Sequence, residues 1–182
     1  MVQSKEQDSI IKGCQKGDRK AQEQLYKNYY QAMITLCLRY TKNDADAVEV
    51  LNTGFFRVFK NIGQFNQGKA SLYTWIRAII INSCLDSIKA KQKARQYYEI
   101  DEAVEVEIPA DVFNKIKATE LLQLVRRLPP ATQGVFNLYA IEGYSHKEIA
   151  GMMGISEGTS KWHLSEARKS LKQMLETVEV RM

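Results

Sequence analysis

Residues 144–171 read YSHKEIAGMMGISEGTSKWHLSEARKSL, and this stretch decides the fold of the C-terminal part of the chain. Ser145 and Glu148 have the S-x-x-E spacing of a capping box, which predicts a short helix that begins just after Ser145. Gly154 can adopt the left-handed backbone conformation that ends a helix, and Ser156 is a second N-cap residue. The pattern therefore predicts a short helix, a tight turn and a longer helix.

The longer helix should have one buried side and one charged side. Small and apolar residues recur along it at spacings of four, three, four and three: Ser160, Leu164, Ala167, Leu171 and Met174. This arrangement of two helices is the outline of a DNA-binding helix-turn-helix. An ordinary helical hairpin with a solvated outer face would show the same charge pattern, but two consecutive caps and a glycine turn favour the helix-turn-helix.

In a helix-turn-helix the second helix enters the major groove of duplex DNA. Outward residues near its N-terminus then face base edges, and those further along face phosphates. The candidates for contacts to bases are Glu157, Thr159, Lys161, Trp162 and Ser165, and Ser156 is also expected to contact the upstream duplex. The candidates for contacts to phosphates are Arg168, Lys169 and Lys172.

Charge is distributed unevenly along the 182 residues, whose net charge is +5. Residues 1–96 contain 16 Lys and Arg and 8 Asp and Glu. Residues 97–114 contain no Lys or Arg and 6 Asp and Glu. Residues 115–182 contain 10 Lys and Arg and 7 Asp and Glu. We therefore expect two basic domains, 1–96 and 115–182, joined by an acidic linker at 97–114, and an anionic partner. An isolated strand within the linker is an alternative, but no partner strand is evident.

Several classes of protein are not supported by the composition. Cys14, Cys37 and Cys84 are far apart and form no C-x-x-C pair, and the chain has two histidines, so we expect core cysteines and no metal or other cofactor. We find no nucleophile–base pair or phosphate-binding glycine loop, so we expect no catalysis. Without a signal peptide or a long apolar run, we expect a cytoplasmic protein that does not insert into a membrane.

Helical periodicity extends through the rest of the chain and predicts an all-α fold of two small domains. We expect a first helix up to about Lys16, a second capped by Asp18, and a third starting at Asp44 or Asp46. Ser71 should cap a fourth helix, after a loop at 64–70. The third helix should bury Val48, Leu51, Phe55, Val58 and Phe59. Beyond the linker, helices are expected over 112–128 and from Pro130 onwards.

The fourth helix carries a second candidate for nucleic-acid binding. Trp75, Asn82, Asp86, Lys89 and Lys93 fall in one stripe at helical spacing, with Lys91 and Arg95 nearby. This combination suits a single strand of nucleic acid. The ring can stack on an unpaired base, the amide can form hydrogen bonds with a base edge, and the ammonium groups can contact phosphates. The alternative is that Trp75 belongs to the core and that Asn82 and Asp86 pair inside a helical bundle.

Together these motifs resemble a bacterial sigma factor of the extracytoplasmic-function (ECF) group over nearly the whole chain. Residues 44–65, DADAVEVLNTGFFRVFKNIGQF, are similar to the helix that docks on RNA polymerase. Residues 71–89 are similar to the segment that melts and holds the minus-ten element, and residues 128–171 to the domain that reads the minus-thirty-five element. The resemblance implies a non-catalytic initiation factor with core RNA polymerase, promoter DNA and an anti-sigma factor as partners.

The resemblance also implies roles for individual residues. Those assigned to polymerase docking are Asp46, Glu49, Asn52 and Phe55, and those assigned to the melted strand are Trp75, Asn82, Lys89, Lys91, Lys93 and Arg95. This sequence departs from the family where Val48 and Thr53 replace common acids, where Ser160 replaces a common Val, and at Trp162 and His163.

Two other functions remain possible from the residues alone. One is a two-domain helix-turn-helix regulator that binds duplex DNA without polymerase, but it does not explain the stripe on the fourth helix. The other is an enzyme acting on nucleic acid, which would need an acid cluster or metal ligands that we do not find.

Overall fold

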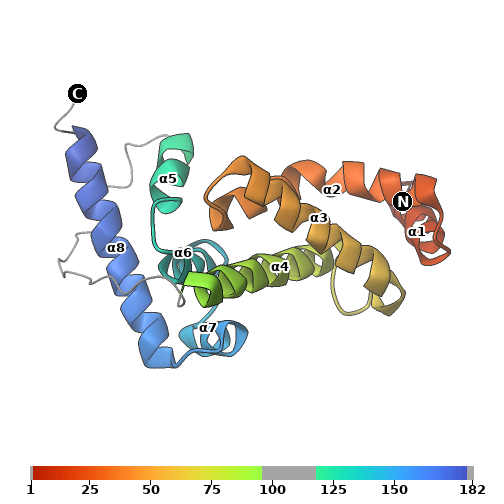
Figure 1. The fold of residues 1–182 in the computed structure, drawn as a ribbon. Coiled ribbons are helices and arrows are strands. Elements are labelled where there is room, and N and C mark those ends of the chain that lie inside the picture. The colour runs from red at the N-terminus through yellow and green to blue at the C-terminus, as the bar shows by residue number, and fades with distance from the viewer. Residues whose placement is uncertain (1, 96–117, 180–182) are drawn as a thin grey trace. The chain divides into compact units, whose positions relative to one another are not determined.

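The computed structural model describes residues 2–95 and 118–179, and every regular element in these two ranges is a helix (Figure 1). The expected all-α class is thereby confirmed. None of the described helices is long and apolar enough to cross a membrane. The acidic linker expected at 97–114 and the start of the helix expected at Val112 lie outside the described residues.

The chain forms two compact units, and its fourth helix contributes to both. One unit contains residues up to Leu38 together with Asn43–Cys84, and the other contains Arg39–Lys42 together with the chain from Leu85 onwards. The elements of the N-terminal part are α1 (Val2–Gln15), α2 (Arg19–Tyr40), α3 (Asp44–Asn61), the short 3₁₀ helix η1 (Ile62–Gln64) and α4 (Leu72–Arg95).

Apolar side chains of α2, α3 and α4 form the core of the first unit. The fully buried ones include Leu25, Met33, Leu51, Phe55, Ile76 and Ile80. Each such side chain contributes about 1.5–3 kcal/mol by leaving water. At Gly54, α3 approaches α4 so closely that an added Cβ would lie 2.4 Å from Cδ1 of Ile80. Gly54 therefore allows the Ile80 side chain to pack directly on the backbone of α3.

The predicted helix starts in this unit are confirmed. Asn43 is the N-cap of α3, since its side chain accepts a hydrogen bond from the backbone N–H of Asp46 at 2.8 Å. Ser71 likewise accepts from the N–H of Thr74 at 3.1 Å at the start of α4. Two of the predicted core residues of α3 are placed differently: Val48 is 40% exposed and does not belong to the core, and Phe59 is half-buried. The buried positions beside Val48 are Ala47 and Leu51, because the buried face of the helix is narrower than its apolar sequence suggests.

The second unit contains the predicted helix-turn-helix. Its elements are α5 (Ala118–Val125), α6 (Pro130–Phe136), the π-helix η3 (Asn137–Ile141), α7 (His146–Met153) and α8 (Glu157–Glu179). The side chains of Leu128, Leu138, Ile149 and Leu171 are fully buried between them. The predicted helix from Pro130 is present, but it continues as a π turn, closed by a bond from the N–H of Glu142 to the carbonyl of Asn137 at 2.9 Å.

Candidate nucleic-acid interface

The start of α7 is held by the predicted capping box. The Ser145 hydroxyl accepts from the backbone N–H of Glu148 at 3.3 Å, and the Glu148 carboxylate accepts from the backbone N–H of Ser145 at 2.8 Å. The Ser145 hydroxyl also donates to the Glu148 carboxylate at 2.7 Å, and this bond, together with the one from the Ser145 backbone N–H, lowers the pKa of the Glu148 carboxyl. Both partners satisfy backbone donors that the helix leaves unpaired.

The turn between α7 and α8 depends on Gly154. Its φ is +72°, in the left-handed region, and its N–H donates to the carbonyl of Ala150 at 2.9 Å. Ile149 and Met153 are buried, while Met152 is half-buried. The turn therefore fixes the direction in which α8 leaves α7.

At the start of α8, Ser156 is the predicted N-cap. Its hydroxyl accepts from the N–H of Thr159 at 2.9 Å and lies 2.8 Å from the Thr159 hydroxyl. Both hydroxyls thus already take part in the cap. The predicted buried side is confirmed at Ser160, Leu164, Ala167 and Leu171, whereas Met174 is half-buried.

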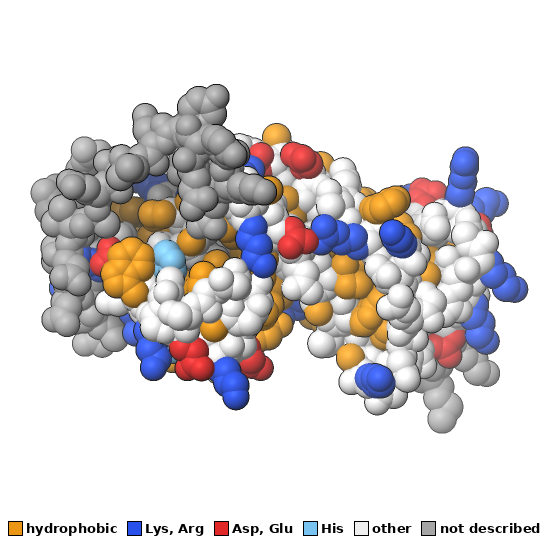
Figure 2. Space-filling view, turned by 60° about the horizontal axis from the view of Figure 1, so that its bottom comes forward, with side chains coloured by type: hydrophobic (Ala, Val, Ile, Leu, Met, Phe, Trp, Pro, Cys, Tyr) orange, Lys and Arg blue, Asp and Glu red, His pale blue; other side chains and the backbone are white. Residues whose placement is uncertain are grey.

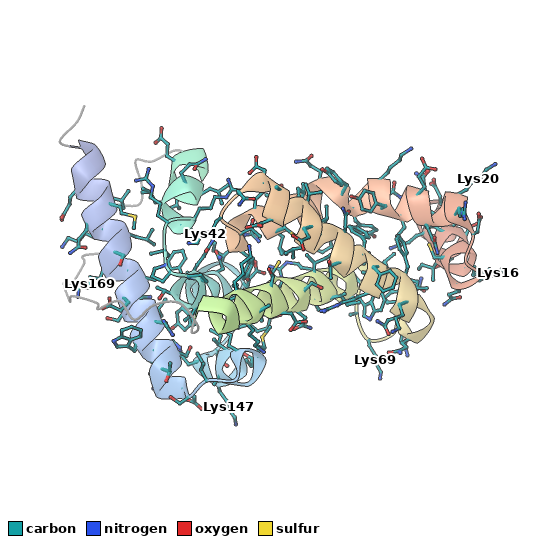
Figure 3. All side chains as sticks on the ribbon, in the orientation of Figure 1. Lys16, Lys20, Lys42, Lys69, Lys147 and Lys169 are labelled. Atoms are coloured by element: carbon teal, nitrogen blue, oxygen red, sulfur yellow. The ribbon has the colours of Figure 1, made fainter. Side chains whose placement is uncertain are left out.

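The outer face of α8 presents most of the residues predicted to contact duplex DNA. Those that are exposed are Ser156, Glu157, Thr159, Lys161, Trp162, Ser165 and Arg168. Two predicted phosphate contacts are placed differently. Lys169, labelled on α8 in Figure 3, is 4% exposed with its ammonium 3.5 Å from Glu166, and Lys172 is half-buried, 3.9 Å from Glu176. In this structure Arg168 is therefore better placed than Lys169 to reach a phosphate.

Two histidines link α8 to its neighbours, which the sequence reasoning missed. Nδ1 of His146 lies 2.9 Å from the Ser160 hydroxyl, and Nδ1 of His163 lies 3.0 Å from the Thr132 hydroxyl. Tyr139 stacks on His146 with ring centroids 4.6 Å apart. Burial lowers the pKa of His163, and the nearby Glu166 carboxylate opposes that shift. The signal in the sequence was Ser160, a hydroxyl at a core position that needs a polar partner.

The stripe on α4 is partly available for binding. Asn82, Asp86, Lys89 and Lys91 are exposed, and the side chains of Lys93 and Arg95 lie outside the described residues. The ammonium of Lys89 donates to the carbonyl of Met152 at 3.0 Å, a contact inside the second unit. Trp75 is half-buried, and its ring centroid lies 5.4 Å from that of Phe65. Trp75 is therefore neither a fully buried core residue nor a fully exposed one.

A hollow lies beside the loop that precedes α4. Its volume is about 510 Å³, and its lining includes Gln64 at the end of η1, the loop residues Phe65, Asn66 and Gln67, and the α1 residue Asp8. The loop is shaped by the Asn66 side chain, which accepts from the N–H of Gly68, and by a hydrogen bond from Gln67 to Asp8. Lys69, labelled in Figure 3, projects from the same loop. Amide groups and an aromatic ring thus line a cavity of the size that small organic groups occupy.

The outer face of α3 requires a correction. Glu49 and Asn52 are exposed and Asp46 is half-exposed, and the Asn52 amide oxygen accepts from the Tyr26 hydroxyl at 3.1 Å. Phe55, however, is 1% exposed and packs on Tyr26 at 4.6 Å, so its side chain does not reach a partner. The adjacent Phe56 is 69% exposed instead, because successive residues of a helix point about 100° apart.

The exposed charges do not form one large basic patch on the face shown in Figure 2. Lys and Arg side chains there lie among acidic, hydrophobic and uncharged ones. Among the described residues, no group of three or more His, Cys, Asp and Glu side chains could hold a metal ion.

Comparisons with known proteins agree with this arrangement. Residues 25–94 match sigma-70 region 2, and residues 118–171 match sigma-70 region 4. The chain is 24% identical over 189 residues to the RNA polymerase sigma-H factor of Pseudomonas aeruginosa, and the match covers 97% of each chain. It is 26% identical over 160 residues to the ECF RNA polymerase sigma factor SigM of Mycobacterium tuberculosis, covering 87% of this chain and 79% of that one.

Among solved structures, the fold is similar to that of the sigma factor RpoE of Bartonella quintana in complex with the anti-sigma factor NepR. The TM-score is 0.54 at 18% identity, covering 85% of this chain and 96% of that chain. The two matched regions lie within the two basic parts of the sequence, residues 1–96 and 115–182. The match to the sigma-H factor extends over nearly the whole length of both chains. The chain therefore belongs to the sigma-70 family of transcription initiation factors, in its extracytoplasmic-function group.

Proposed function

We propose that this sigma factor recruits core RNA polymerase through α3, reads the upstream promoter element as duplex through α8, and holds the melted strand with α4 and the loop before it. In this scheme residues 1–96 dock and melt, 97–114 form a linker, and 115–182 read duplex DNA. The chain itself performs no catalysis, and it works in the cytoplasm, where polymerase is found.

The exposed outer face of the second helix of the helix-turn-helix carries the proposal. Two capped helices joined at Gly154 present Lys161, Trp162, Ser165 and Arg168 on one exposed surface. Such a helix fits the major groove, where polar side chains distinguish base pairs and Arg meets guanine or phosphate.

The melted strand is assigned to Trp75, Asn82 and the hollow beside the loop at 64–70. A half-exposed indole offers a stacking surface to an unpaired base, and the amides in the loop can form hydrogen bonds with its edge. Lys91 and, where it is released from the Met152 carbonyl, Lys89 would neutralise phosphates.

Docking on polymerase is assigned to Glu49, Asn52 and Phe56 on the outer face of α3. An exposed aromatic ring surrounded by polar groups has the composition of an interface hot spot. An anti-sigma factor is a further proposed partner, supported by the similar fold of a sigma factor that was solved with one.

The test uses purified core polymerase. The chain should co-purify with the core enzyme, and the complex should make thymines near the start site reactive to permanganate on a cognate promoter. The free chain should bind the same duplex weakly. Tight, site-specific footprinting by the free chain that core polymerase leaves unchanged would favour a duplex-binding regulator instead.

A further inference from the structure

Trp162 lies at the centre of the outward face of α8. The buried residues Ser160, Leu164, Ala167 and Leu171 define the inner side, and at about 100° per residue Trp162 points away from their mean direction. Its side chain is 48% exposed, and in the described part of α8 it is the one large hydrophobic residue exposed to this degree.

The surroundings of Trp162 hold its ring on one side and leave it open on the other. The ring centroid lies 4.9 Å from that of His163 at an interplanar angle of 67°, and His163 is itself bonded to the Thr132 hydroxyl. Four residues earlier stands Gly158, where even an added Cβ would meet nothing closer than the Ser156 hydroxyl at 3.6 Å. Helical side chains lean toward the N-terminus, so the indole borders bare backbone.

This geometry limits what Trp162 can recognise. An indole offers apolar carbon atoms and one N–H donor, and it has no acceptor. In the major groove the apolar feature that distinguishes one base is the 5-methyl group of thymine. The exposed residues beside Trp162 are Lys161 and Ser165, and the first half of α8 has no exposed Asn or Gln that could bind adenine through two hydrogen bonds.

We propose that Trp162 recognises the 5-methyl group of one thymine in the upstream promoter element. This inference rests on the proposed reading of duplex DNA by α8. It assigns the indole a defined base, whereas Lys161 and Arg168 contribute mainly through charge. His163 and Thr132 act as positioning residues that hold the ring toward the groove.

The test replaces single thymines by uracil, which removes only the methyl group. Holoenzyme containing the full chain first selects a promoter from a library with a randomised upstream element. Each thymine of the selected element, on either strand, is then changed to uracil and recruitment is measured. One position should show about fourfold weaker recruitment, the effect of withdrawing one methyl group from an apolar contact. With Trp162→Ala the same change should have no effect.

Lys161→Ala is the matched control, because it should weaken recruitment overall while retaining the response to uracil. If no thymine-to-uracil change affects the unaltered protein, the inference is overturned, and this result does not depend on how any variant folds. An equal loss in the unaltered protein and in Trp162→Ala also overturns it. If holoenzyme selects no upstream element at all, the result would instead contradict the proposed function, the reading of duplex DNA by α8.

Discussion

His146 and Ser160 are joined by a contact of 2.9 Å between Nδ1 and Oγ, which ties the first helix of the helix-turn-helix to the second. Ser160 is fully buried, so its hydroxyl needs a partner, and His146 supplies it. Tyr139 stacks on the face of the imidazole, with ring centroids 4.6 Å apart, and restricts its orientation. A polar link therefore lies inside the otherwise apolar contact between α7 and α8.

The first prediction measures this link by a double-mutant cycle. Ser160→Ala, His146→Ala and the double variant are compared by chemical denaturation. We expect a coupling free energy of about 0.5–1.5 kcal/mol, the contribution of one hydrogen bond. The loss of the Tyr139 stack occurs in both variants that lack His146 and cancels. Strictly additive effects would show that the contact adds nothing to stability.

The second prediction compares two glycines of the helix-turn-helix. Gly154→Ala should lower the free energy of unfolding by about 1–2 kcal/mol, because φ is +72° and a Cβ is strained there. Gly151→Ala should raise it by about 0.5–1 kcal/mol, because this residue lies inside α7, is exposed, and an added Cβ meets nothing within 4 Å. Urea denaturation of both variants checks the opposite signs, and equal signs would contradict the assignment of the turn.

The third prediction uses the adjacent rings of α3. Phe55→Ala should cost about 3–5 kcal/mol of stability, because the ring is buried against Tyr26 and Phe59. Phe56→Ala should change stability by less than about 0.5 kcal/mol, because the ring is 69% exposed. If α3 docks on polymerase, Phe56→Ala should nevertheless weaken co-purification with core enzyme. If a folded Phe56→Ala protein binds core polymerase as well as the unaltered protein does, polymerase must contact a different surface.

Local patterns were sufficient to predict much of this fold. Capping residues act on backbone groups three positions away, so Ser145, Gly154 and Ser156 could be assigned from the sequence alone. Exposure within an apolar run could not be assigned in this way. Val48 was placed in the core although it is 40% exposed, because a run of apolar residues on a helix does not show which of them faces solvent. Periodicity placed Phe55 in the core correctly, and only the docking role taken from the family resemblance conflicts with its burial.

Contacts between helices were beyond sequence reasoning. The pairs His146–Ser160 and His163–Thr132 join residues that are 14 and 31 positions apart, and nothing in a helical period links them. The burial of Lys169 likewise depends on tertiary packing, because its position on α8 next to Arg168 suggested an outward charge. The predicted roles in docking and in DNA binding remain predictions.

The fourth prediction concerns pH. Burial lowers the pKa of His163 below its ordinary value of 6.5, so the unfolded chain binds a proton more readily than the folded one. The corresponding stability is present above pH 6.5 and is lost as the pH falls from 6.5 toward the lower pKa of the folded state. Denaturation midpoints at pH 7.5 and 5.5 should therefore differ more for the unaltered protein than for His163→Gln. Identical pH dependence in both proteins would exclude this role of His163.

The last prediction concerns Trp75, whose ring is partly packed on Phe65 and partly accessible. If the accessible part stacks on an unpaired base, it contributes about 1–3 kcal/mol only after the strands separate. Trp75→Ala should then leave recruitment to the upstream element unchanged but reduce strand opening, and a template with a pre-melted bubble should partly restore transcription.

Lys161→Ala is the comparison, because a residue that acts on intact duplex should weaken recruitment in a way that no bubble corrects. Circular dichroism melting separates the stacking role from a purely structural one, since loss of a core tryptophan costs about 3–5 kcal/mol. A folded Trp75→Ala protein that gains nothing from the bubble would show that the melted strand is held by other residues. In that case the amide-lined hollow beside the loop at 64–70 becomes the candidate to test, beginning with Gln64→Ala.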